Sequence, residues 1–214
     1  MRRIAVIAAL AIGFATPAIG DHYLQAEPRE YALEGATQIK VEFPVGRLTI
    51  EGDDGNTVRV LVRVDCRERD YEDCKRETRR IRIEHHVSEG RFALQFEGIR
   101  KELGSPRINV EARLLVPRKL VSRAEMGVGE LRVSGMTSDI EAELGVGELT
   151  VKADARHYRD AEAESGVGHA TIRAPGGDVR DRGFIGHTAR WTDGHGPSFL
   201  RAHVGVGQVE VTLR

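Results

Sequence analysis

Two pairs of glutamates with the same spacing are the residues of this 214-residue chain best suited to chemistry. Glu141 and Glu143 alternate with apolar residues, and Glu162 and Glu164 repeat the pattern 21 residues later. If both segments are strands stacked in register, the four carboxylates form a block with about 4.8 Å between strands and about 7 Å along each strand. Such oxygen ligands suit Ca²⁺, which extracellular modules bind weakly, so one hypothesis is a surface Ca²⁺ site. The alternative is a salt-bridge ladder closed by arginines of neighbouring segments. No other cofactor is expected.

A second group of polar side chains surrounds the single tryptophan and comprises Asp181, His187, Arg190 and Trp191. In one interpretation it is a ligand patch, with Trp191 as the platform for a sugar or another planar group. In the other, the strand register slips locally, so that Ala189 and Trp191 face inwards and the charges face solvent. The residues alone leave both interpretations open.

The two cysteines, Cys66 and Cys74, enclose a highly charged segment. The spacing is not that of a C-x-x-C redox motif, and a close pair in an oxidising compartment is typical of a structural disulfide. Closing so short a loop stabilises a fold by roughly 2–3 kcal/mol in the chain-entropy model.

The string Gly-Val-Gly does not indicate a phosphate loop, although it begins at Gly127, Gly145, Gly166 and Gly205. It lacks the third glycine of a dinucleotide fingerprint, and no helical pattern follows it. The chain has no Ser-His-Asp order and no zinc-ligand spacing, so we predict that it is not an enzyme. Its net charge of −1 argues against a nucleic-acid partner.

The Gly-Val-Gly string instead marks an internal repeat, whose second glycine recurs at 129, 147, 168, 186 (in a degraded copy) and 207. Apolar residues alternate on both sides of it and slip by one position at the glycine, which predicts a bent or bulged strand. We therefore predict an all-β fold, a single-stranded parallel β-solenoid (β-helix-like) whose coils stack in chain order and leave an open edge after Arg214. The alternative is an antiparallel up-and-down β-sheet or sandwich, which suits the alternating steps of 18 and 21 residues.

Stacked coils place equivalent residues in columns. One column, predicted to face the interior, contains Val128, Val146, Val167, Ile185 and Val206. Residues 57–116 read as an inserted antiparallel β-meander, and we predict no helix after residue 20, because residues 67–80 lack an apolar stripe.

The N-terminus has the pattern of a secretory signal peptide, with Arg2 and Arg3 before an apolar run and small residues at 18 and 20. The predicted organisation is a signal peptide over residues 1–20, an N-terminal β region over 21–119 and the Gly-Val-Gly β-solenoid over 120–214. We expect an exported protein, periplasmic or at the cell surface, with no transmembrane segment after signal cleavage.

The Gly-x-Gly repeats, the segment from Val116 to Leu120 and the signal-like N-terminus resemble the "putative adhesin" or toastrack family of bacterial envelope β-repeat proteins. The resemblance covers most of residues 36–214. It implies a β-repeat fold and an adhesin-like role, and it implies no catalytic residues. The departure is the fourth unit, where Asp181 and Arg190 occupy positions that should face inwards.

These patterns together predict a non-enzymatic, exported cell-envelope scaffold that binds an envelope protein or a surface glycan along one face. One alternative is a Ca²⁺-stabilised envelope-stress sensor. Another is a carbohydrate-active enzyme on a β-helix, which normally needs long loops around an acidic groove, whereas the turns here look short. The sequence does not indicate an oligomeric state.

Overall fold

The computed structural model describes residues 22–25, 28–66, 71–99, 109–181, 186–192 and 194–214. The signal peptide predicted over residues 1–20 lies outside this part of the chain. The described residues form thirteen strands, one α-helix, α1 (Tyr71–Thr78), and one 3₁₀-helix, η2 (Ala155–His157). The strands are β1 (His22–Gln25), β2 (Arg29–Ala32), β3 (Gln38–Asp53), β4 (Thr57–Cys66), β5 (Arg82–Ser88), β6 (Arg91–Glu97), β7 (Asn109–Pro117), β8 (Val121–Ser134), β9 (Ile140–Ala153), β10 (Tyr158–Ala174), β11 (Gly177–Asp181), β12 (His187–Trp191) and β13 (Ser198–Leu213).

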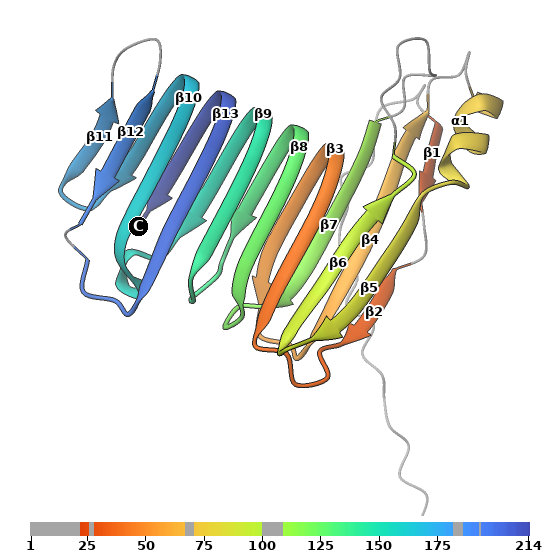
Figure 1. Cartoon of the computed structure of the whole chain (residues 1–214), viewed down its shortest axis with the longest axis horizontal. Helices are drawn as coiled ribbons and strands as arrows, with labels where there is room; N and C mark the ends of the chain where they lie inside the picture. The colour runs from red at the N-terminus through yellow and green to blue at the C-terminus, as the bar shows by residue number, and fades with distance from the viewer. Residues whose placement is uncertain (1–21, 26–27, 67–70, 100–108, 182–185, 193) are drawn as a thin grey trace, which may run out of the picture.

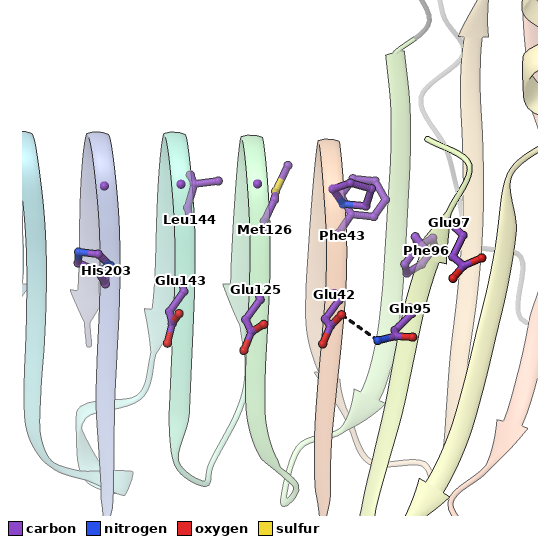
Figure 2. Close-up of a pocket in the computed structure, with 14 residues that line it drawn as sticks. Glu42, Phe43, Gln95, Phe96, Glu97, Glu125, Met126, Glu143, Leu144 and His203 are labelled. Carbon is purple, nitrogen blue, oxygen red and sulfur yellow. Dashed lines mark hydrogen bonds between the residues drawn. The ribbon is translucent and has the colours of Figure 1, made fainter. Parts of the chain in front are cut away.

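Five long strands, β3, β8, β9, β13 and β10, carry the repeat and run parallel in register. Each of them turns over at its Gly-Val-Gly or equivalent segment, so that an N-terminal arm and a C-terminal arm lie in two facing layers (Figures 1 and 2). The partners of the outer repeat strands change accordingly. In β3 the N-terminal arm pairs with β6 and the C-terminal arm with β7, and in β10 the two arms pair with β12 and β11. The fold is therefore an all-β, mixed sheet that is folded into two layers and not closed.

The core lies between the two layers. In β9 the N-terminal arm contributes Ile140, Ala142 and Leu144, and the C-terminal arm contributes Leu149 and Val151, each at most 2% exposed. Equivalent positions of the other repeat strands are buried in the same way. Alternation on each arm with a slip at the bend was the predicted pattern, and the structure confirms it.

The second glycine of each repeat is required by the bend itself. Gly147 has φ +139°, which L side chains rarely adopt, and a Cβ there would lie 1.9 Å from the carbonyl oxygen of Gly129 on the next strand. Gly207 repeats this geometry, with φ +140° and 1.9 Å to the oxygen of Gly147. The bends can therefore stack closely only when these positions carry no side chain.

The valine between the two glycines does not face the core, contrary to the prediction for that column. Val146, Val167 and Val206 are 46–48% exposed and form a short row on the outside of the bend. Because both Leu144 and Leu149 face inwards, the four residues between them span the bend, and the two that carry side chains, Val146 and Glu148, are exposed. Ile185 lies outside the described residues.

The order of the repeat strands in space is not their order in the chain. β13 lies between β9 and β10, giving the order β3-β8-β9-β13-β10. The prediction of coils stacked in chain order is therefore wrong, and so is the open edge expected after Arg214. The backbone of Arg214 instead exchanges hydrogen bonds with Ala153 and Ala155. At that end of the sheet β11 and β12 both run antiparallel to β10, so the degraded fourth unit is not a further parallel coil.

The insertion predicted as a meander is divided between the two layers. β5 and β6 form an antiparallel hairpin in one layer, and β4 pairs antiparallel with β7 in the other, while β6 and β7 each run parallel to β3. The predicted disulfide is present, with 5.8 Å between the Cα atoms of Cys66 and Cys74. It joins the end of β4 to α1, which corrects the prediction of no helix. This short helix packs through the buried Cys74 rather than through an apolar stripe.

β3 belongs to the predicted N-terminal β region, residues 21–119, and β8 belongs to the predicted repeat region, residues 120–214. The two strands nevertheless pair along most of the length of β3. None of the helices in the described part of the chain has the length and hydropathy of a membrane-spanning segment.

Candidate functional site

The outward-facing side chains on the N-terminal arms of the five repeat strands form one polar surface, which we call the front face. They alternate with the buried core residues, because successive side chains of a strand point to opposite sides. The parallel register places equivalent side chains in rows across the strands. The charge of the surface is therefore organised in rows rather than scattered.

The first row alternates in sign over much of its length. It reads Lys40, Arg123, Glu141, Arg201, Glu162 and Arg190 on β3, β8, β9, β13, β10 and β12. Glu141 lies 3.5 Å from Arg123 on one side and 3.7 Å from Arg201 on the other, and Glu162 accepts a hydrogen bond of 2.9 Å from Arg190. Each acidic side chain of this row is therefore paired across the sheet.

The second row lies nearer the bend and is acidic at the β3 end. Figure 2 shows Glu42, Glu125, Glu143 and His203 side by side on neighbouring strands. The cations of the first row compensate these carboxylates both along their own strand and diagonally on the next one. Lys40 Nζ lies 2.6 Å from Glu42 and 3.1 Å from Glu125, and Arg123 lies 2.9 Å from Glu125 and 3.2 Å from Glu143.

The Lys40 pair shifts the titration of both partners. The hydrogen bond from Lys40 lowers the pKa of Glu42, and the same bond raises the pKa of Lys40. Both groups are thus held in their charged forms around neutral pH.

The front face is hollowed at three places among the described residues. The first hollow, of about 570 Å³, lies over the acidic part of the second row and reaches Gln95, which donates a hydrogen bond of 2.9 Å to Glu42 (Figure 2). The second, of about 370 Å³, surrounds Arg201 and His203. The third, of about 400 Å³, lies at the margin away from the bend, between Arg91 and Phe199.

The four glutamates of the hypothetical Ca²⁺ site all line the second hollow, but they are not adjacent to one another across the strands. Arg201 of β13 lies between Glu141 and Glu162, and His203 lies between Glu143 and Glu164, so the predicted two-by-two block is not formed. The predicted adjacency failed because it assumed that β10 follows β9 in space. Within the described part of the chain, no group of three or more His, Cys, Asp or Glu side chains is arranged to hold a metal ion.

The residues of the hypothetical ligand patch are divided between the core and the surface. Trp191, His187 and Ala189 are buried, whereas Arg190 is exposed and paired with Glu162. This is the register slip, and it leaves Trp191 unable to serve as a surface platform. The side chain of Asp181 lies outside the described residues.

Two residues of the front face were missed from the sequence, Arg91 at the start of β6 and Phe199 near the start of β13. The signal for Phe199 was available, because it stands two residues before the outward-facing Arg201 in an alternating strand. Arg91 offered no such signal, because its place beside β3 depends on a long-range parallel pairing.

The fold of this chain is similar to that of a solved structure. No family model and no curated protein matches the chain. Among solved structures, a "putative cell adhesion protein" from Clostridium sporogenes is 17% identical, with a TM-score of 0.53 over 90% of this chain and all of the other. At this identity the likeness concerns the fold alone. A "putative lipid binding protein" from Parabacteroides distasonis (11% identical, 87% of this chain and 62% of the other) and a "putative adhesin" from Bacteroides fragilis (10%, 90% and 97%) have TM-scores of only 0.33 and 0.23.

Proposed function

We propose that this protein is a non-enzymatic, exported scaffold of the cell envelope that binds a partner protein or a surface glycan along its front face. The observation that carries the proposal is the front face itself, a rigid polar surface of in-register strands with three hollows. The structural likeness to a "putative cell adhesion protein" supports it. The disulfide between Cys66 and Cys74 suits an oxidising compartment outside the cytoplasm.

The arrangement of the acidic side chains favours binding over catalysis. A glycosidase pair needs one carboxyl group with a raised pKa, which burial in an apolar pocket normally provides. Glu141 and Glu162 are instead paired with arginines at the surface. Side chains of this kind are suited to accepting hydrogen bonds from the hydroxyl or amide groups of a bound partner.

Two charge reversals on one strand test the role of the front face. Glu143 and Glu148 are both exposed glutamates of β9, but Glu143 lies on the front face and Glu148 lies beyond it, at the end of the bend. We expect Glu143→Arg to weaken binding of the full chain to an array of envelope glycans and purified envelope proteins. We expect the matched control Glu148→Arg to leave that binding unchanged.

Equal losses from both variants would show that net charge, and not the front face, controls binding. Turnover of an envelope polysaccharide that disappears in Glu141→Gln would contradict a non-enzymatic role.

A further inference from the structure

The hollow at the margin of the front face is lined by three cations, Lys40, Arg91 and Arg123, more than line either of the other two. It lies between β6 and β13, over the starts of β3 and β8, and Phe199 contributes an aromatic ring and Val121 an aliphatic side chain to its lining. Both side chains are half-buried. The guanidinium of Arg201 stacks over the Phe199 ring, 4.8 Å from its centroid, and this contact restrains the ring. The hollow therefore combines a held aromatic surface with polar walls.

The cations that line this hollow differ in whether they form ion pairs. Lys40 and Arg123 both line it, and both are paired with front-face glutamates. Arg91 also lines it and is exposed, and within the described residues no carboxylate lies at ion-pair distance from it. The hollow thus holds three cations against the two lining carboxylates Glu125 and Glu141, and Arg91 supplies the uncompensated charge.

The position of the two end residues sets the size of the ligand. In the sheet, Arg91 pairs with Gln38, and Gln38 pairs with Val121. The next strand, β9, begins immediately after Asp139. The carboxylate of Asp139 accepts a hydrogen bond of 3.0 Å from the backbone N–H of Phe199, near the start of β13. The backbones of Arg91 and Phe199 are therefore four strand spacings apart, about 19 Å at about 4.8 Å each. Both side chains point over the hollow between them, leaving room for more than one sugar ring.

From this composition, and resting on the proposed function, we propose that the hollow binds an acidic saccharide, with a sugar ring packed on Phe199 and a sugar carboxylate paired with Arg91. A pyranose has an apolar C–H face that suits an aromatic ring and a rim of hydroxyls that suits planar polar side chains such as Gln38 and Glu141. Arginine pairs with a carboxylate through two parallel hydrogen bonds, which distinguishes a uronic acid from a neutral sugar. A phosphocholine, phosphoethanolamine or phosphoserine headgroup offers no ring to pack on Phe199.

The experiment titrates the full chain with a short oligogalacturonate and, separately, with its neutral methyl ester, by calorimetry at physiological salt. Losing a charge-assisted pair should weaken binding by about 10- to 100-fold. We expect Arg91→Gln to weaken binding of the acid by that factor and to leave the ester unaffected. Phe199→Ala should weaken both ligands, and Phe199→Leu, which keeps an apolar side chain and so protects the fold, should do the same.

The control is Arg82→Gln, which removes an equally exposed cation from the neighbouring strand β5, at the end paired with Glu97. It should change neither titration. Equal weakening of the acid by the Arg82 and Arg91 variants would overturn the proposal, as would equal binding of acid and ester to the unmodified chain. Binding to anionic phospholipid vesicles with no binding of the saccharide would assign the hollow to a lipid surface instead. If no saccharide binds but Glu143→Arg still abolishes binding of another partner, this inference fails and the proposed function stands.

Discussion

Replacing one glycine at the bend should destabilise the fold more than replacing a glycine of equal φ elsewhere. Gly147→Ala introduces two costs. A residue with a Cβ in the left-handed region is strained by about 1–2 kcal/mol. In addition, its Cβ would lie 1.9 Å from the carbonyl oxygen of Gly129, so the strands must separate, and overpacking of this kind costs about 1–3 kcal/mol.

Gly177→Ala isolates the first of these costs. Gly177 has φ +131°, close to the +139° of Gly147, but a Cβ there meets nothing within 4 Å. The gain from restricting the unfolded chain is the same in both variants and cancels in the comparison. Gly147→Ala should therefore be less stable than Gly177→Ala by about 1–3 kcal/mol. In a domain of this size that difference lowers Tm by a further 2–12 °C or so.

Thermal unfolding followed by circular dichroism, with urea unfolding as a second measure, gives this difference directly. Equal stabilities for the two variants would refute the reasoning, because they would show that the stacked bends open without cost.

Four further outcomes are expected. Arg201→Glu should cost about 1 kcal/mol in urea unfolding, since it places three carboxylates in a row; no loss would mean that the row contributes nothing. Burial raises the pKa of Tyr158, so the stability of the protein should fall as pH rises above 10, where only the unfolded phenol ionises. Tyr158→Phe should lose about 1 kcal/mol at pH 7 and lack this alkaline slope, and an unchanged slope would contradict it. Millimolar Ca²⁺ should leave Tm unchanged, whereas a rise of several degrees would restore the Ca²⁺ hypothesis. Replacing Cys66 and Cys74 by serine should cost about 2–3 kcal/mol, measured by unfolding in urea.

The repeat could be predicted from the sequence because its physical cause is local. A glycine with positive φ that lets a neighbouring carbonyl approach is needed at every bend, so it recurs at every bend. In-register pairing follows from the same cause, and Gly129, Gly147, Gly207 and Gly168 indeed lie in one row. The bent strands and the parallel pairing can therefore be predicted from the position of the glycine in each repeat unit.

Other features depend on contacts that no local pattern contains. The exposed row of Val146, Val167 and Val206 was missed in the sequence. Alternation shows that the inward face shifts by one residue at the bend, but it does not show whether the valine between the two glycines faces the core or solvent. The helix α1 was missed because a disulfide and the burial of Cys74, rather than an amphipathic stripe, hold its eight residues. The third hollow was missed because it depends on β6 pairing with β3 across an insertion.

The position of β13 is the most informative of these differences. At one level of the core the inward side chains of β9, β13 and β10 are all alanines, Ala142, Ala202 and Ala163, so the order of the strands makes little difference to packing at that level. The outward side chains are not equivalent.

If β10 lay directly beside β9, Glu141 would oppose Glu162, Glu143 would oppose Glu164, and on the other arm Lys152 would oppose Arg173. Like charges placed directly opposite each other across a sheet are destabilising. With β13 in between, Arg201, His203 and Thr212 separate the three pairs. At these three positions the observed strand order therefore avoids the like-charged neighbours that stacking the units in sequence would create.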